Sequence, residues 1–575
     1  MSGDRPGALS DVAVLTVIGC LFGLAGALWL WGGLAGVVFG SGWPRVGVGE
    51  LLGVLIRLPA RLSDPARAWP AGARARLPGA AGFYGALGLL SAGVIAVASL
   101  SVRATAGLRS GAGARWARSA DLSRLRHRGA GAAAAAVLGV PQVRRGMRLV
   151  LGRRGGRLLY AEERHALVAF GPPQSGKSAG IAIPALLEWT GPAVASSIKT
   201  DLLSATRARR EALGEVLVFD PFGLAQSSSQ TWSPLEGART WDGALEVAWR
   251  LASAGELDRR SVEGGDFWAV AAEQRLAPLL YAAAAAGVGM DSVVRWVHGQ
   301  GARELDETLA RITGEAHDER ELAGAHAAYD AIRAFAAQAD RTRTSIEATA
   351  QTLLRAYRFQ RVIQSARSSE ITADRVLDRT TTLYLIGDAK ASKLLRPLFL
   401  ALLGEIVDRA YERATLAGGA LERPLLLCLD EAGNVAPLPH LAEIASTAPS
   451  HNIQLVTIFH DLSQARSRYG QQAETVINSH RARMLLPGVA DLDTLRYFAG
   501  LIGEEEARDR THTTGTGGTT RSTSRRRRPL IAAETLRQLP DGHALLLYGR
   551  IAPTRVRLRR WFEDRRLRRL ARGAS

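Results

Sequence analysis

The stretch that decides the fold is residues 166–178, which read ALVAFGPPQSGKS. The first five residues are apolar and predict a short buried strand, and the rest fit the pattern G-x-x-x-x-G-K-[ST]. A run that favours a helix, residues 179–189, follows directly. In this order, a strand, a glycine-rich loop and a helix bind phosphates through backbone N–H groups and the helix N-terminus. The stretch therefore predicts an α/β fold with a P-loop that binds ATP.

The loop residues have separate expected roles. Lys177 is expected to reach the β- and γ-phosphates, and the Ser178 hydroxyl is expected to ligate Mg²⁺. The chain has 73 basic residues and only four lysines, so 73 − 4 = 69 are arginines, and a lysine here indicates a need for a compact ammonium. The predicted nucleotide-binding residues are Gly171, Pro172, Pro173, Gln174, Ser175, Gly176, Lys177 and Ser178.

An acidic pair is expected to complete this site. Residues 425–429 form an apolar run that ends in Asp430 and Glu431, the pattern of a Walker B strand. We expect Asp430 to join Ser178 in holding Mg²⁺, and Glu431 to orient and activate the attacking water. Four other apolar runs lack polar alternation and predict a parallel sheet with both faces covered. They are residues 193–198, 215–219, 382–386 and 455–459.

The composition excludes several classes of protein. The 575 residues are 47% hydrophobic and 22% charged, which excludes a disordered or collagen-like chain. Cys20 and Cys428 are the only cysteines, which excludes a disulfide scaffold and a multi-cysteine metal site. The net charge of +19 comes from arginine throughout the chain. It is therefore weak support for nucleic-acid binding.

Two long uncharged runs lie near the N-terminus. Residues 12–43 and 77–102 contain no charged side chain, and each exceeds the roughly 20 residues that span a bilayer. We expect two transmembrane helices, at about 12–40 and 78–102, in a membrane anchor of residues 1–104. The alternative is a pair of buried helices in a soluble core. Arginine counts on the two sides of the helices barely differ, but the need for ATP predicts that the C-terminal region is cytoplasmic.

The remaining chain predicts three regions. Residues 105–160 are a basic linker next to the membrane, and 161–240 together with 373–575 form the nucleotide-binding domain. Residues 241–372 are predicted as an inserted helical domain with a small core of its own. Residues 508–528, rich in Thr, Gly, Ser and Arg, predict a disordered or mobile loop. Its arginines either form a solvated surface or contact a phosphate backbone.

The order of these motifs resembles that of the type IV secretion coupling proteins, the TraG/TraD-type conjugative ATPases. The resemblance covers nearly the whole chain, and it is specific because of three further segments. They read SIKTD at 197–201, VLVFDP at 216–221 and LRQLPDGHALL at 536–546.

The resemblance implies a hexameric, membrane-anchored ATPase with RecA-like domains in a ring. Such proteins bring relaxase-bound single-stranded DNA, or protein substrates, to a type IV secretion channel. The segment from about 426 resembles the part that recognises the relaxosome accessory protein TraM.

Two positions depart from the family pattern. His460 stands where a glutamine is usual, although an imidazole still hydrogen-bonds a γ-phosphate or water. Pro449 stands where an arginine is often offered to the neighbouring subunit, and an arginine finger is worth about 10³ to 10⁵ in rate. Either another arginine replaces it, with Arg481 and Arg483 as candidates, or the enzyme is slow.

Two alternative functions follow from the sequence. The first is an FtsK-like double-stranded DNA translocase, against which the helical insertion and the C-terminal segment argue. The second is a docking receptor that binds ATP with low turnover and recruits protein cargo, which Pro449 favours.

Overall fold

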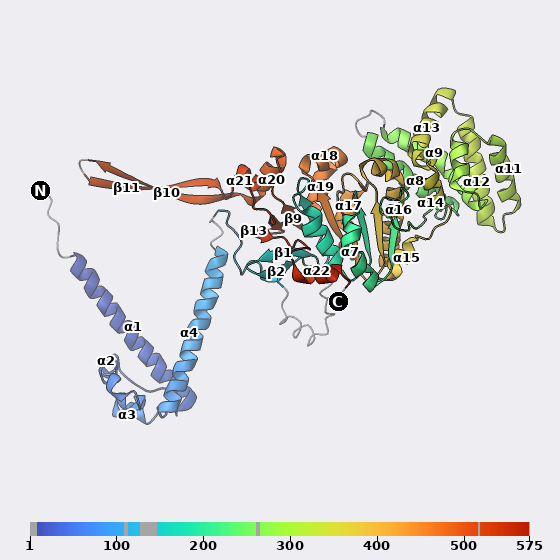
Figure 1. Cartoon of the computed structure of the whole chain (residues 1–575). Helices are drawn as coiled ribbons and strands as arrows, with labels where there is room; N and C mark the ends of the chain where they lie inside the picture. The colour runs from blue at the N-terminus through green and yellow to red at the C-terminus, as the bar shows by residue number, and fades with distance from the viewer. Residues whose placement is uncertain (1–7, 109–112, 127–146, 260–264, 516–517, 574–575) are drawn as a thin grey trace. The chain divides into compact units, whose positions relative to one another are not determined.

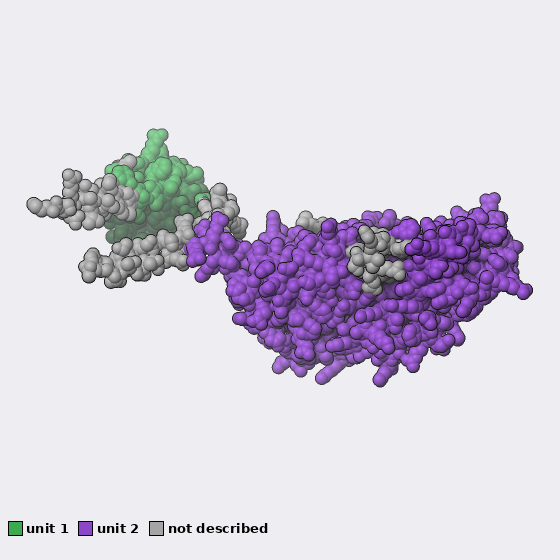
Figure 2. All heavy atoms as spheres, turned by 90° about the horizontal axis from the view of Figure 1, so that it is seen from above, with its two compact units in different colours: residues 1–112 green, residues 113–575 purple. Residues whose placement is uncertain are grey.

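The structure is a computed structural model of the chain, and it describes residues 8–108, 113–126, 147–259, 265–515 and 518–573. The chain divides into two compact units, residues 1–112 and 113–575, which Figure 2 shows in different colours.

The first unit is built on two long helices, α1 (Ala8–Phe39) and α4 (Ala80–Leu108). Between them lie α2 (Val48–Arg57), η1 (Pro59–Arg61), η2 (Pro65–Ala68) and α3 (Ala71–Arg74). An aromatic cluster holds these elements together: the Trp69 and Phe83 ring centroids are 4.9 Å apart, and Trp31 Nε1 donates to Phe83 O at 2.7 Å.

Both long helices contain a segment that is long and apolar enough to cross a membrane, Phe22–Phe39 and Ala80–Ala98. On α4, the side chains of Val94, Ile95 and Val97 are exposed in this unit, so they lack the protein cover that a core helix would have. The two predicted apolar helices are thus present. That they cross a membrane stays a prediction.

The second unit contains an eleven-stranded sheet in the order β2-β1-β13-β12-β9-β3-β8-β7-β4-β6-β5 (Figure 1). The seven strands from β9 to β5 are parallel, which confirms the predicted parallel sheet. These strands are β3 (Leu167–Phe170), β4 (Ala193–Ser197), β5 (Val216–Phe219), β6 (Thr382–Ile386), β7 (Leu425–Leu429), β8 (Ile453–Phe459) and β9 (Ala482–Leu485).

Four antiparallel strands extend the sheet beyond β9: β12 (His543–Tyr548), β13 (Ile551–Arg557), β1 (Val150–Arg154) and β2 (Arg157–Tyr160). The last two come from residues that we assigned to the linker. Gly155 and Gly156, both with positive φ, make the turn between β1 and β2. Leu151 and Leu159 are buried between the arginines of these strands, so this basic segment is half-buried sheet.

Helices cover both faces of the sheet. On one face, η5 (Ser178–Ala182), α6 (Ile183–Glu188), α7 (Asp201–Leu213) and α22 (Arg565–Ala571) pack on alternate residues of the strands, such as Ala169 and Cys428. On the other face, α16 (Ala389–Leu416) packs on the intervening residues, such as Leu427. The face includes α17 (Leu441–Thr447), α18 (Leu462–Tyr469), α19 (Gln472–Ser479), α20 (Leu492–Ile502) and α21 (Ala533–Arg537).

The insertion between β5 and β6 is helical, and most of its helices gather at one end of the unit (Figure 1). It comprises α8 (Trp241–Arg259), α9 (Gly265–Ala285), α10 (Met290–Val297), α11 (Ala302–Gly314), α12 (Glu319–Ala336), α13 (Asp340–Leu353), η6 (Arg355–Arg358), α14 (Gln360–Ser365) and α15 (Ala373–Asp378).

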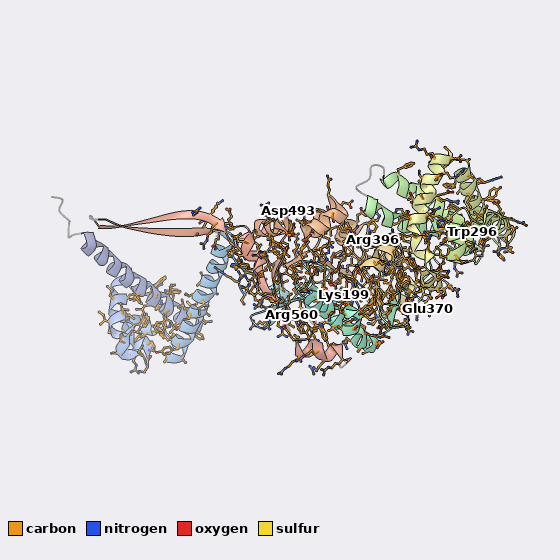
Figure 3. The ribbon with its side chains drawn as sticks, turned by 45° about the horizontal axis from the view of Figure 1, so that its top comes forward. Lys199, Trp296, Glu370, Arg396, Asp493 and Arg560 are labelled. Carbon is orange, nitrogen blue, oxygen red and sulfur yellow. The ribbon has the colours of Figure 1, made fainter. Side chains whose placement is uncertain are left out.

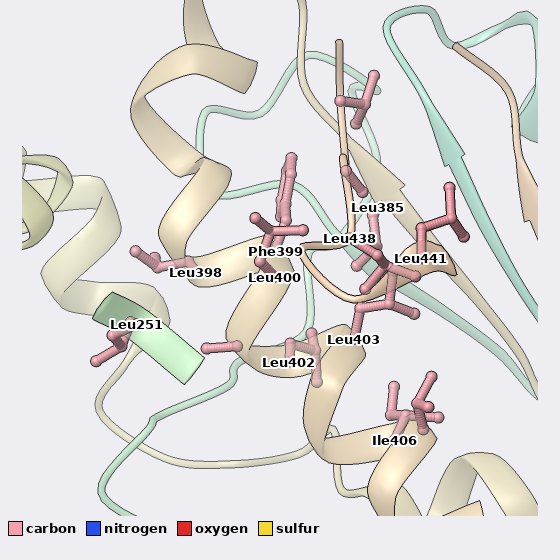
Figure 4. Packing of buried hydrophobic residues seen from close by; sticks show 14 of the residues in the cluster. Leu251, Leu385, Leu398, Phe399, Leu400, Leu402, Leu403, Ile406, Leu438 and Leu441 are labelled. Carbon is pink, nitrogen blue, oxygen red and sulfur yellow. The ribbon is translucent and has the colours of Figure 1, made fainter. Parts of the chain in front are cut away.

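We expected this insertion to have a small core of its own. Such a cluster exists, formed by Ala271, Phe335 and Ile346, but most buried residues of the insertion belong to a larger core. Leu251 of α8 belongs to the same hydrophobic cluster as Phe399 of α16 and Leu385 of β6 (Figure 4). The reason is α16, whose 28 residues bury side chains toward both the sheet and α8. The insertion and the sheet therefore form one packed unit.

The segment predicted as a mobile loop is instead an antiparallel hairpin, β10 (Glu504–Gly515) and β11 (Gly518–Pro529), which projects from the sheet (Figure 1). The pairing places Glu505 opposite Arg528, and Arg528 Nε lies 2.8 Å from Glu505 Oε1. The composition of the segment did not predict this hairpin, because the side-chain pairs that stabilise it lie across its two strands. The Thr-rich sequence also suits extended backbone.

Candidate nucleotide-binding site

Three neighbouring strands deliver the predicted site residues to one edge of the sheet. The P-loop follows β3, Asp430 and Glu431 follow β7, and His460 follows β8, which lies between the other two. Because these strands are parallel, their carboxyl ends meet at the same edge. Lys177 thereby meets His460, 283 positions along the chain, with 2.8 Å between Nζ and Nδ1.

The P-loop is folded tightly around its glycines. Gly171 N–H donates to Phe459 O at 3.1 Å, and a Cβ on Gly171 would lie 2.5 Å from Ser175 Oγ. Gly176 has φ of +88°, a conformation that favours glycine. Ser178 then opens the single π-helical turn η5, which continues as α6. The predicted sequence of strand, loop and helix is thus present.

Ser178 and Asp430 make the contact that a magnesium site requires. Ser178 Oγ donates to Asp430 Oδ2 at 2.5 Å, and the other oxygen, Oδ1, is buried and has no hydrogen-bond partner among the residues that the structure describes. Asp430 is only 3% exposed, and burial raises its pKa to about 6, although Ser178 and Lys177 oppose this shift. A hydroxyl beside a carboxylate with an unused oxygen fits Mg²⁺, which prefers oxygen ligands.

Lys177 lies buried above these carboxylates. Burial lowers the pKa of its ammonium, and Glu431 and Asp430 oppose that change. Its charge is held between His460 and the acidic pair, in a place where phosphates could replace them as partners.

Glu431 is the centre of a polar network. Asn434 Nδ2 donates to Glu431 Oε2 at 2.9 Å, and His460 Nε2 lies 3.6 Å from the same oxygen. Burial alone would raise the pKa of Glu431, but His460, Asn434 and Lys177 together lower it to about 2. The carboxylate is therefore held ionised and oriented, with φ of +60° at its own backbone.

Residues that we did not predict support this network. Gln464 Oε1 accepts from the His460 backbone N–H at 2.8 Å, and Gln464 Nε2 donates to Asn434 Oδ1 at 3.3 Å. Gly433 allows this approach, because a Cβ there would lie 2.9 Å from Gln464 Cδ. Lys199, which follows β4, is near enough to the site for its charge to lower the pKa of Lys177. Figure 3 labels Lys199 within this unit.

The other predicted residues fall into two groups. The middle of the P-loop is formed by Pro172, Pro173, Gln174 and Ser175, of which Pro173 and Gln174 are exposed. Arg481 and Arg483 lie at the amino end of β9, the edge opposite the P-loop, and Arg483 donates to Ile477 O at 3.1 Å. Pro449 precedes β8 at that same edge. The two arginines therefore do not face the phosphate site of their own chain.

The chain is similar to proteins of one known family. The family described as "Type IV secretory system Conjugative DNA transfer" matches residues 119–572. The "Conjugal transfer protein TraG" of Escherichia coli is 23% identical over 60% of this chain and 56% of its own length. The "Protein VirD4" of Agrobacterium fabrum is 23% identical over 72% of this chain and 61% of its own length. The chain thus spans about three fifths of the curated relatives that it matches.

Solved structures show the same fold. The unbound "Bacterial conjugative coupling protein TrwBdeltaN70" has a TM-score of 0.57 at 18% identity, covering 78% of this chain and 92% of its own. The "Plasmid coupling protein TrwB in complex with ADP and Mg2+" has a TM-score of 0.55 at 17% identity, covering 78% and 93%. The fold is therefore that of a RecA-like P-loop NTPase. With the family match over most of its length, the chain belongs to the type IV secretory system conjugative DNA transfer family, the family of the coupling proteins.

Proposed function

We propose that this protein hydrolyses ATP and uses the energy to pass a conjugative substrate to a type IV secretion channel. The observation that carries the proposal is the meeting of Lys177, Ser178, Asp430 and Glu431 at one sheet edge. The family match supports the transfer role, and relatives solved with ADP and Mg²⁺ support the cofactors.

Each residue of the site has its own role in ATP hydrolysis. The P-loop backbone and Lys177 bind the β- and γ-phosphates, which replace His460 and the carboxylates around the Lys177 ammonium. Ser178 and Asp430 would hold Mg²⁺, which would supply positive charge to the phosphates. Glu431, fixed by Asn434, orients the attacking water. His460, held through its backbone by Gln464, donates to the γ-phosphate or to that water.

The substrate is single-stranded DNA bound to a relaxase, as the family resemblance implies. The protein acts as a ring of six copies, anchored in the inner membrane by α1 and α4, with its ATPase unit in the cytoplasm beside the channel components. Recognition of a relaxosome accessory protein by the segment from about 426 is part of the same proposal. The family match favours this function over that of an FtsK-like double-stranded DNA translocase.

A second candidate is the docking receptor that binds ATP with little turnover and recruits protein cargo. It is favoured by Pro449, which stands where an arginine is often offered to the neighbouring subunit. Both readings predict ATP binding, and they differ in hydrolysis.

The test is the ATPase rate of the full-length chain in lipid nanodiscs, with and without single-stranded DNA. Coupled transfer predicts hydrolysis that single-stranded DNA stimulates and that Glu431→Gln removes. Binding of ATP without hydrolysis under either condition would reject the motor and establish the docking receptor. Stimulation by duplex DNA alone would instead support a double-strand translocase.

A further inference from the structure

The chain returns to the P-loop after its last strand. Trp561 N–H donates to Ala179 O at 3.0 Å, and Leu558 packs on Gly180, where a Cβ would lie 3.1 Å from Leu558 Cβ. Residues 558–564, which we call the return segment, are therefore fixed to the first turn after the P-loop. Our sequence analysis assigned this segment no role at the site.

Two consecutive arginines of the return segment have different surroundings. Arg559 is 3% exposed, with Nη1 2.6 Å from Glu188 Oε2 and Nε 3.0 Å from Asp564 Oδ2. Both its partners are largely buried, so this arginine fastens the return segment to the end of α6. Among the described residues, Arg560 is paired with exposed carboxylates: its Nη2 is paired with Asp541 Oδ1, and its Nη1 lies 3.5 Å from Glu563 Oε1.

The guanidinium of Arg560 faces the P-loop glycine. A Cβ built on Gly176 would have two neighbours within 4 Å, Arg560 Nε at 3.6 Å and Arg560 Nη2 at 3.8 Å. The open side of such a glycine, with φ of +88°, is where a ligand approaches the backbone closely. Arg560, labelled in Figure 3, thus presents a cation beside the open side of this P-loop glycine.

We propose that Arg560 binds the phosphate chain of the nucleotide, and that Asp541 competes with the nucleotide for its guanidinium. The proposal rests on the proposed function, since it presumes that the P-loop binds ATP or ADP. A guanidinium binds phosphate through paired charge-assisted hydrogen bonds. Asp541 is 75% exposed, and such a surface ion pair contributes little, so phosphate can displace it.

The exchange links nucleotide binding to the C-terminal part of the chain. Asp541 and Gly542 lie in the turn before β12, and Leu558 N–H donates to Gly542 O at 2.8 Å. When Arg560 turns to the phosphates, Asp541 loses its ion pair, and this turn loses one of its attachments to the return segment. The attachment of the turn that carries Asp541 thereby depends on whether nucleotide is bound.

The competing explanation is that the ion pair of Arg560 and Asp541 only stabilises the fold. Substituting each partner alone separates this explanation from the proposal. Calorimetry would measure ADP binding to the full-length protein. We expect Arg560→Ala to weaken ADP binding by about tenfold, the effect of losing a charge-assisted hydrogen bond. Asp541→Asn is expected to tighten ADP binding, because it frees the guanidinium. Arg569→Ala, which removes an exposed arginine of α22, is the control for net charge.

Three outcomes would overturn the proposal. If Arg560→Ala and Asp541→Asn weaken ADP binding equally, the ion pair only stabilises the fold. Equal weakening by Arg560→Ala and Arg569→Ala would show only a general charge effect. Unchanged binding by Arg560→Ala, with binding lost in Lys177→Ala, would reject the role of Arg560 and leave the P-loop intact. If Lys177→Ala also binds normally, the proposed function itself fails. Melting temperatures of all variants identify any that are misfolded.

Discussion

At the scale of single residues, the candidate site depends on a few buried groups whose charges balance. Lys177, Asp430 and Glu431 lie within one network, so a change in one alters the environment of the others. Their roles are best separated by variants that change one property each.

Lys177→Ala should abolish ATP binding and transfer, because it removes the only buried ammonium that the described residues place beside the P-loop. Lys177→Arg should also fail if the site requires a compact ammonium, since a guanidinium is larger and planar. Binding of a fluorescent ATP analogue and conjugation frequency measure the two effects. Wild-type transfer by Lys177→Ala would contradict the P-loop assignment.

Glu431→Gln should bind ATP normally and lose hydrolysis by at least about a hundredfold, since an amide cannot accept a proton from water. The amide still fits beside Asn434, so the network should persist. A filter-binding assay and a phosphate-release assay measure the two steps. Hydrolysis at the wild-type rate would place the base elsewhere.

His480 makes the stability of the protein depend on pH. It is fully buried, its Nδ1–H donates to Val476 O at 2.7 Å, and its Nε2 accepts from the Thr457 hydroxyl at 2.9 Å. Burial lowers the pKa of His480 from 6.5 to about 4. Between these values the unfolded chain binds more protons than the folded one, so acid favours unfolding. The contribution of His480 to the free energy of unfolding is fully present above pH 6.5 and is lost as the pH falls toward 4.

From pH 6.5 to 5 this effect removes about 2 kcal/mol of stability. The melting temperature should therefore fall more between pH 7 and 5 in the wild type than in His480→Gln, whose side chain does not titrate. Parallel curves for the two proteins would show that His480 is not responsible.

At the scale of elements, we ask whether the arginines of the hairpin β10–β11 contact DNA. Glu504 to Glu506 lie opposite residues 527–529, so acidic and basic side chains pair at its base, whereas Arg526 lies opposite Ala507. Arg526, Arg527 and Arg528 are exposed, which makes them available to a polyanion.

Replacing Arg526, Arg527 and Arg528 with Ala should reduce the salt dependence of single-stranded DNA binding by about 2 units of slope, at about 0.7 per phosphate contact. Binding titrations at several salt concentrations measure the slope. The matched control replaces Arg565, Arg568 and Arg569, which removes three exposed charges from α22. If both variants change the slope equally, the hairpin makes no specific contact. If neither does, its arginines are solvated surface charges.

At the scale of the whole molecule, the chain offers a natural division between residues 112 and 113. The second unit begins with contacts that a shorter fragment would lose: Ala114 N–H donates to Glu504 O, and Ala117 N–H donates to Pro553 O at 2.8 Å. A fragment meant to retain the second unit should therefore begin at Gly113.

A protein that begins at Gly113 should leave the membrane fraction, because both apolar helices are removed. Fractionation at high salt measures this, with the full-length chain as the control. The second unit should keep its melting temperature, since its core lies within residues 113–575. Membrane association that survives high salt would show that another part of the chain is the main attachment.

The sequence by itself determined the features that depend on local pattern. Apolar runs identified six of the seven parallel strands, all but β9, and the spacing of Gly171, Gly176 and Lys177 identified the P-loop, because each signal lies within a few adjacent residues. The long uncharged runs identified α1 and α4 for the same reason.

Only the tertiary structure decided what depends on contacts between distant segments. The strands β1 and β2, the ribbon β10–β11 and the shared core of the insertion exist because of partners far along the chain or across a strand. The same is true of Asn434 and Gln464 beside Glu431, and of Arg560 beside Gly176. Such residues carry no local signal, since their role is defined by the fold that brings them to the P-loop.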